Sequence, residues 1–187
     1  MLQPFNRLLI SWIAGAEAGT LSAAEFDGAY SILPSERLVS GCYLNELLLT
    51  LFARHDTHAD VFDLYSAALS SLKTAADALP VLRVFEKRLL EALGYGLSLH
   101  RDAITGQPID SSRTYHYRLE QGPVAAMDVA EGPLVFSGAT LQALAREELH
   151  DAMACQDARR LLRAALDRVL DGKELKSRQV MLALRKK

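Results

Sequence analysis

The spacing of apolar residues predicts that most of the chain beyond position 34 is helical. Apolar side chains recur there at intervals of three and four residues, the period at which one face of an α-helix is buried. A first predicted helix follows Pro34, a polar break at 56–60 separates it from a second, and Pro80 opens a third that Gly94 ends. The apolar positions of the three helices are Leu38, Cys42, Leu44, Leu47, Leu48 and Leu51; Val61, Leu64, Tyr65, Ala68 and Leu72; and Leu82, Phe85, Leu89, Leu90 and Leu93.

Helical periodicity returns near the C-terminus, weakly at 140–146 and strongly at 156–170. Gly172 ends the stronger helix. Its inward-facing positions are Leu161, Leu162, Ala165, Val169 and Leu170. The positions outside this apolar stripe include Arg159, Arg160, Arg163 and Arg168.

Two other stretches do not have a helical pattern. Residues 7–13 and 20–26 are short β-prone runs separated by a glycine-containing segment, which predicts two strands joined by a turn. Because a lone hairpin is marginally stable in water, we expect it to be the last part of a larger sheet. Between 97 and 136, glycines and prolines interrupt the pattern while 114–119 alternates, which predicts a loop or small hairpin insert.

Composition is that of a globular protein with one main core. The chain has 187 residues, of which 50% are hydrophobic and 24% charged. Its two cysteines, Cys42 and Cys155, are far apart, so neither a disulfide framework nor a zinc knuckle is expected. No apolar run approaches the roughly 20 residues that cross a bilayer. We therefore expect a cytoplasmic protein without a membrane partner.

Charge is unevenly distributed along the chain. Positions 159–187 contain ten lysines and arginines against three acids, whereas positions 1–158 contain 11 basic and 20 acidic residues. Clustered basic residues attract polyanions whatever the net charge. Cations that offset a helix dipole would account for only two or three of them. Because 159–187 contains no aromatic residue, we expect contacts to phosphates, strong salt dependence and little sequence preference.

Motifs of common enzymes are absent. There is no phosphate-binding P-loop, and Gly94-Tyr-Gly96 lacks the third glycine of a dinucleotide-binding loop. The sequence at 147–150 lacks the second histidine of a zinc-protease helix, and His55 with His58 is more typical of a solvated turn than of a metal site. We predict a protein that is not an enzyme and has no cofactor, metal or small-molecule substrate.

Short motifs in order along the chain resemble the family of the bacterial recombination mediator RecO. They are Leu2-Gln-Pro-Phe5 with Gly19-Thr-Leu21, Tyr43-Leu-Asn-Glu-Leu47, Leu82-Arg-x-Phe-Glu86 with Leu93-Gly-Tyr-Gly96, Gly106-x-Pro-Ile-Asp110, and Gly172-Lys-x-Leu-Lys-Ser-Arg178. The resemblance extends over essentially the whole chain. Each motif is weak alone, and their shared order and spacing carry the resemblance.

The resemblance implies a mainly α fold, with a RecO-like helical domain after an N-terminal OB-fold β-barrel. Met1 aligns inside that barrel, so we expect residues 1–30 to be its last strands, a remnant, and 35–187 to be the helical domain with the insert at 97–136. It also implies a bacterial, nucleoid-associated protein of the RecF pathway. Such a protein binds and anneals single-stranded DNA and helps load the recombinase onto DNA coated with single-stranded DNA-binding protein (SSB). The implied partners are single-stranded DNA, the acidic C-terminal tail of SSB, and RecR.

Individual residues acquire expected roles from the resemblance. Arg83 occupies the position that helps receive the SSB tail, and the alternative is that it pairs with Glu86 on the surface of its own helix. Asp102 and Thr105 stand where some family members have zinc-binding cysteines, so zinc is not expected. The residues predicted to contact DNA are Arg159, Arg160, Arg163, Lys173, Lys176 and Arg178.

A second hypothesis keeps the fold and changes the function. In it the chain is a helical protein-interaction module that binds the SSB tail or RecR and has no DNA-binding activity of its own. Binding of single-stranded DNA at low and moderate salt distinguishes the two hypotheses.

Overall fold

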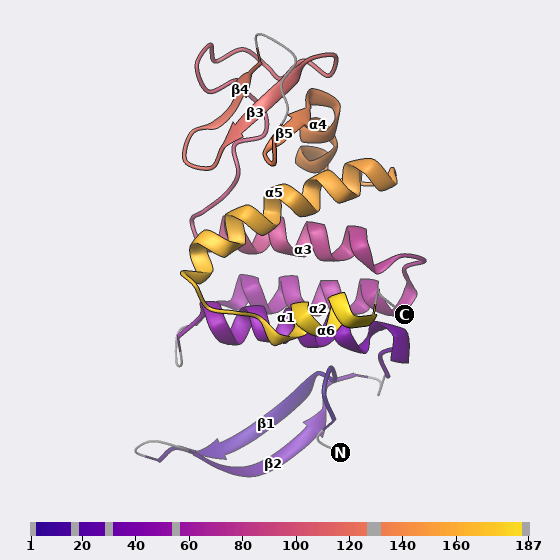
Figure 1. Ribbon diagram of the computed structural model, residues 1–187. Coiled ribbons are helices and arrows are strands. Elements are labelled where there is room, and N and C mark those ends of the chain that lie inside the picture. The colour runs from indigo at the N-terminus through magenta and orange to yellow at the C-terminus, as the bar shows by residue number, and fades with distance from the viewer. Residues whose placement is uncertain (1–2, 16–18, 29–31, 54–56, 127–131, 185–187) are drawn as a thin grey trace.

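The computed structural model describes residues 3–15, 19–28, 32–53, 57–126 and 132–184 (Figure 1). Helices predominate, as the sequence predicts, and short antiparallel strands precede and interrupt them. The strands are β1 (Leu8–Ile13), β2 (Thr20–Phe26), β3 (Thr114–Arg118), β4 (Gly122–Ala125) and β5 (Val135–Ser137). The helices are the short 3-10 helix η1 (Ser35–Arg37) followed by α1 (Leu38–Leu51), α2 (Ala59–Thr74), α3 (Ala78–Ala92), α4 (Gly138–Arg146), α5 (Ala152–Leu170) and α6 (Lys176–Leu184).

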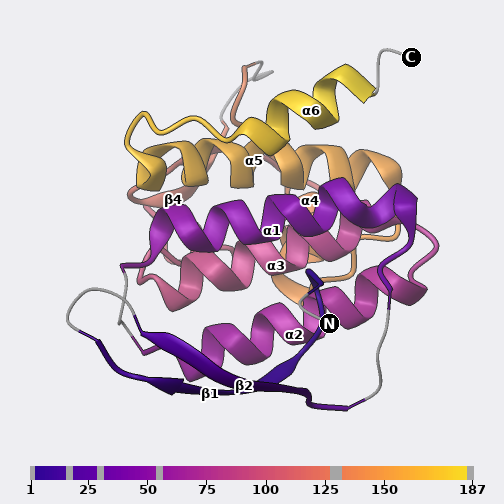
Figure 2. The same ribbon diagram turned by 90° about the horizontal axis from the view of Figure 1, so that it is seen from below.

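The core is formed by the helices α1, α2, α3 and α5, which stack in layers (Figure 1). Leucines at the predicted apolar positions fill it, and Leu44, Leu47, Leu72, Leu89 and Leu90 have no exposed surface. Turning the view shows α6 lying beside both α5 and α1 (Figure 2). The fold therefore places the basic residues of α6 against α1, which precedes them by more than a hundred positions.

Side chains of aspartates set the start of two helices. The third helix begins at Ala78, two residues before Pro80, because the Asp77 carboxylate accepts the Leu79 N–H. The fifth begins at Ala152, earlier than the predicted 156, because the Asp151 carboxylate accepts the Ala154 N–H. At the other end Gly172, with φ of +79°, follows the last turn of α5 in the left-handed conformation that favours glycine.

The N-terminal hairpin contrasts with this core. Strands β1 and β2 pair with each other in an antiparallel ladder with a register shift at Ser11 and Trp12, which confirms the predicted hairpin. Trp12 and Ile13 are 59% and 67% exposed. The chain reaches the helices through Phe5, whose ring lies 2.8 Å from the position that a β-carbon on Gly41 of α1 would occupy. Glycine at this position therefore lets the segment before the hairpin approach the bundle.

The insert contains a small sheet, and α4 follows its last strand β5 and contacts it. Strand β3 lies between β4 and β5, both antiparallel to it, and its tyrosines Tyr115 and Tyr117 are buried while their neighbours are exposed. Where a loop or hairpin was expected, the structure has three strands, with β5 added to the pair β3 and β4. In the described part of the chain, no helix combines the length and apolar character that crossing a membrane requires.

Candidate anion-binding site

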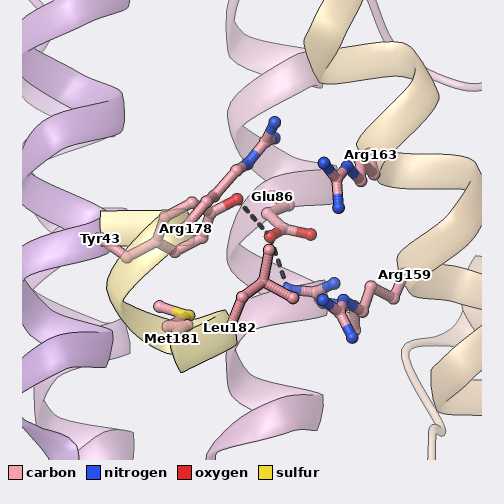
Figure 3. Close-up of a pocket in the computed structure, with 8 residues that line it drawn as sticks. Tyr43, Glu86, Arg159, Arg163, Arg178, Met181 and Leu182 are labelled. Carbon is pink, nitrogen blue, oxygen red and sulfur yellow. Dashed lines mark hydrogen bonds and ion pairs between the residues drawn. The ribbon is translucent and has the colours of Figure 1, made fainter. Parts of the chain in front are cut away.

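Four arginines from three helices line one hollow between α1, α3, α5 and α6 (Figure 3). Arg83 comes from α3, Arg159 and Arg163 come from successive turns of α5, and Arg178 comes from α6. The remaining lining residues are Tyr43, Glu86, Met181 and Leu182. We call this the arginine hollow. Among the described residues that line it, Glu86 is the one with a carboxyl group, so the lining itself carries more basic than acidic side chains.

The floor of the arginine hollow is a buried polar cluster. The Tyr43 hydroxyl donates to Glu86 Oε1 over 2.6 Å, and Arg83 Nη2 donates to the same oxygen over 2.6 Å. The Arg83 and Glu86 side chains are 7% and 2% exposed, so the ion pair predicted as an alternative forms inside the protein instead of on a helix surface. Within the described residues, Arg83 Nε and Glu86 Oε2 have no hydrogen-bond partner.

Burial dominates the protonation of this cluster. Removal from water disfavours a charged carboxylate, so burial raises the pKa of Glu86, while the Arg83 charge and the Tyr43 hydrogen bond oppose the shift. Burial and the neighbouring Glu86 likewise raise the pKa of the Tyr43 hydroxyl. A proton is therefore held more tightly here than on an exposed carboxyl group.

The outer rim is formed by Asp167 and the two arginines that it pairs. Asp167 Oδ1 accepts a hydrogen bond from Arg178 Nη1, and its Oδ2 lies 3.7 Å from Arg163 Nε. The Arg178 guanidinium also lies 6.0 Å from the centre of the Tyr43 ring. Asp167 thus links α5 to α6 and holds Arg163 and Arg178 side by side.

A second carboxylate fixes the start of α6. Glu46 on α1 accepts the backbone N–H groups of Lys176 and Ser177, each over 2.8 Å, and also the Ser177 hydroxyl. Burial acts to raise the pKa of Glu46, but these hydrogen bonds outweigh it and hold that pKa below the ordinary value. This clamp positions Arg178 and Met181 over the arginine hollow.

The structure separates the predicted DNA contacts into two groups. Arg159, Arg163 and Arg178 meet at the arginine hollow, and Lys173 lines a neighbouring hollow with Arg163 and Arg178. Arg83, predicted to receive the SSB tail, lines the arginine hollow with them. Lys176 is exposed at the start of α6.

Arg160 lies on the other side of α5. Its guanidinium pairs with Asp157 over 3.2 Å, donates to the Val135 carbonyl over 2.8 Å and lies 4.9 Å from the centre of the Phe136 ring. Arg160 therefore contacts the insert, and it does not contribute to the arginine hollow.

Several residues of the site were not predicted site residues. Tyr43 and Glu46 lie in one of the short motifs by which the sequence resembles a known family, and Glu86, predicted only as an alternative partner of Arg83, lies in another. Met181 and Leu182 belong to no motif, and only the packing of α6 brings them to the hollow.

In the insert, Asp102 organises the loop that precedes the sheet. Its carboxylate accepts the N–H groups of Ile104, Thr105 and Ala125 over 2.7–2.9 Å. These hydrogen bonds, that of Thr105 first, lower the pKa of Asp102. Among the described residues no group of three or more potential metal ligands comes together, and His55 lies outside them.

The fold and the hollow define a class of protein, a helical domain with a candidate anion-binding site. Comparison with known proteins makes this specific, since residues 35–179 match the family described as "Recombination protein O C terminal". Chains named DNA repair protein RecO are similar to this chain over nearly all of its length. The Nitrosococcus oceani chain is 42% identical over 186 residues, 100% of this chain and 76% of the relative. The Alkalilimnicola ehrlichii chain is 45% identical over 180 residues, 95% of this chain and 71% of the relative.

These matches show that the chain belongs to the RecO family. The Nitrosospira multiformis relative, also named DNA repair protein RecO, is 38% identical over 182 residues, 97% of this chain and 75% of the relative. The resemblance inferred from the short motifs is thereby confirmed. The protein is a bacterial protein of DNA repair and recombination.

Proposed function

We propose that this protein acts as a recombination mediator that binds and anneals single-stranded DNA and helps load the recombinase onto SSB-coated DNA. The observation that carries the proposal is the convergence of four arginines from three helices on one hollow with a single lining carboxyl group. A mediator of this kind holds strands and partners close together by charge, and it makes or breaks no covalent bond. Its site of action is the nucleoid, in the bacterial cytoplasm.

Contacts to DNA are proposed to run from the arginine hollow to the start of α6. Arg159, Arg163, Lys173, Lys176 and Arg178 would neutralise phosphates, which lets two like-charged strands approach. Base stacking is not expected, because 159–187 contains no aromatic side chain. Arg160 stays a predicted phosphate contact of smaller effect, because its guanidinium is already bound to the insert.

The SSB tail is proposed to bind where Arg83 meets an apolar wall. Arg83 and Arg159 also line a second hollow, between the starts of α3 and α5, together with Leu79, Ala152 and Cys155. An acidic peptide with an apolar end and a terminal carboxylate needs guanidinium groups beside apolar surface. RecR is a further proposed partner.

The division of the chain is also a proposal. Residues 1–30 would be the last strands of an OB-fold, and 35–187 the helical domain with its insert at 97–136. The exposure of apolar side chains on β1 and β2 supports this division, because such strands are stable when the rest of a sheet covers them.

The DNA-binding proposal is tested by reversing charge at the start of α6. Lys176→Glu with Arg178→Glu is expected to weaken binding of single-stranded DNA several-fold. It is also expected to flatten the dependence of binding on salt, because a variant with fewer phosphate contacts releases fewer counterions when it binds. Fluorescence anisotropy with a labelled oligonucleotide at several salt concentrations measures both. The matched control is Arg113→Glu with Arg118→Glu, an equal charge change at exposed positions of the insert. Unchanged affinity and salt slope in the first variant would contradict the proposal.

Ion pairing favours the second candidate, a protein-interaction module without DNA binding. Asp167 pairs with Arg163 and Arg178, Asp157 with Arg160, and Glu120 with Arg168. These carboxylates reduce the charge available to a phosphate backbone. An electrophoretic shift of single-stranded oligonucleotide at low and moderate salt separates the candidates, since the module alone gives no shift at either.

A further inference from the structure

A buried guanidinium group at the floor of the arginine hollow has an unused hydrogen-bond donor. The Arg83 side chain is 7% exposed, and its Nη2 donates to Glu86 Oε1. Within the described structure, Arg83 Nε and Glu86 Oε2 have no hydrogen-bond partner. Buried polar groups in native proteins are paired with protein atoms, ordered water or an ion, because an unpaired one costs free energy. The Arg83 N–H therefore requires an acceptor inside the hollow.

The charges in and around the hollow favour an acceptor that is an anion. The lining contains four guanidinium groups and the carboxyl group of Glu86, and Asp167 at the rim pairs with Arg163 and Arg178. Four guanidinium groups thus lie near two carboxyl groups in this part of the described structure. Guanidinium groups keep their charge in proteins. An anion lowers the repulsion between these arginines, whereas a water molecule in the same place does not.

The open volume of the hollow selects a very small anion. This volume is about 40 Å³, and a cavity needs roughly 10–15 Å³ to hold one water molecule. The hollow therefore has room for about three water-sized bodies. No segment of a peptide or a strand fits inside, and phosphates can reach the arginines only from outside the hollow. A single-atom anion such as chloride does fit, together with some of its water.

The side chains that would contact such an ion come from different helices. Arg159 and Arg163 extend from α5 toward Glu86, and Arg178 extends from α6 on the facing side (Figure 3). Arg83 lines the floor from α3. A guanidinium group presents several N–H donors in a fixed fork and is weakly hydrated, so it exchanges water for a halide ion at low cost.

We propose that the arginine hollow binds one chloride ion, which accepts the Arg83 Nε–H and contacts the guanidinium groups of Arg159 and Arg163. Water in the rest of the hollow donates to Glu86 Oε2 and separates this oxygen from the ion. The bound ion links α3 to α5 beneath α6 and stabilises arginines that otherwise repel one another. The inference requires neither DNA nor a protein partner, so it is independent of the proposed function.

Thermal unfolding of the full chain tests for the ion. Sodium chloride is compared with sodium gluconate at equal ionic strength, because gluconate is too large for the hollow. A ligand that binds only the folded state raises Tm, by about 3–6 °C at ten times its Kd for a chain of this size. Ionic screening is equal in the two salts, so a higher Tm in chloride reports binding of chloride.

Matched variants on α5 assign the effect to the hollow. Arg159→Ala removes a guanidinium group from the lining and is expected to abolish most of the difference in Tm between the two salts. Arg168→Ala removes the same charge from the same helix. Because Arg168 pairs with Glu120 outside the hollow, this variant is expected to keep the wild-type difference. Circular dichroism verifies that both variants are folded.

Chloride NMR gives a second measurement, which does not depend on the stability of the variants. Chloride that exchanges between the protein and solution has a broadened resonance. The wild type and Arg168→Ala are expected to broaden it, and Arg159→Ala is expected to broaden it much less.

The outcomes separate chloride from water and from other sites. Equal Tm in the two salts without line broadening would mean that water alone satisfies the floor, and this overturns the inference. A chloride effect that is unchanged in Arg159→Ala places the ion elsewhere and overturns it as well. A rise in Tm and a line broadening that Arg159→Ala loses and Arg168→Ala keeps support it.

Discussion

The two sides of α5 carry the same residue type and differ in what it contacts. On one side Arg159 and Arg163 face α3 and α6 across the arginine hollow. On the other, Arg160 is bound to Val135 and Phe136 and Arg168 to Glu120. One position along a helix is a rotation of about 100°. Adjacent arginines can therefore serve opposite purposes, with one side of α5 proposed to bind ligands and the other attaching the insert.

The largest expected effect comes from the buried floor of the hollow. Glu86→Ala leaves Arg83 charged and buried without its partner, and this is expected to lower the free energy of unfolding by about 3–5 kcal/mol. Urea unfolding followed by circular dichroism measures the loss. Glu91→Ala, on the same helix but with a 46% exposed side chain, is the control and is expected to cost less than about 1 kcal/mol. Equal stabilities of the two variants would contradict this account of the floor.

On the insert side, the corresponding anchor is Asp102. Asp102→Ala removes the acceptor of three backbone N–H groups and is expected to cost about 1–3 kcal/mol. Hydrogen exchange at the amides of Ile104, Thr105 and Ala125 reports the change locally, and all three should exchange faster. Asp63→Ala, at an exposed position on α2, is the control. Protection that persists at these amides would show that something other than Asp102 holds the loop.

A smaller effect is expected from pH. Burial raises the pKa of Glu86 above the ordinary 4.5, so between 4.5 and the raised value the folded state binds a proton that the unfolded state has lost. The contribution of Glu86 to stability is therefore present below this window and decreases as pH rises through it.

Glu86→Gln removes this titration while keeping the shape of the side chain. Urea unfolding of both proteins across a pH series gives the difference in stability, which isolates Glu86 from the other carboxyl groups. As pH rises above 4.5, the free energy of unfolding of the wild type should fall relative to that of Glu86→Gln. A difference independent of pH would contradict the raised pKa.

Sequence periodicity predicted the helical bundle because burial imposes a period on each helix, whereas the hairpin was predicted from two β-prone runs separated by glycines. It also identified Arg159, Arg160, Arg163 and Arg168 as lying outside the apolar stripe of their helix. It could not separate them into two sides, because that depends on whether α6 or the insert packs against each one.

The candidate site was predicted only in part for the same reason. Arg83 was identified through its motif, and its pair with Glu86 was weighed as an alternative on the helix surface. The structure places this pair under α6, where Met181 and Leu182 cover it. Tyr43 is separated from Met181 by well over a hundred positions, and no local pattern can predict such a contact. The sequence predicted an insert between helices. It did not predict the role of Asp102, because one of the N–H groups that this carboxylate accepts belongs to Ala125, 23 residues away.

The most direct test of the central claim compares the two sides of α5 at equal charge. Two double variants, Arg159→Ala with Arg163→Ala and Arg160→Ala with Arg168→Ala, are titrated with single-stranded DNA over a range of salt concentrations. Loss of two phosphate contacts should reduce the magnitude of the logarithmic salt slope by about 1.4 in the first variant, and the second should change it far less. Equal slopes in the two variants would show that net charge alone, and not the arginine hollow, determines binding.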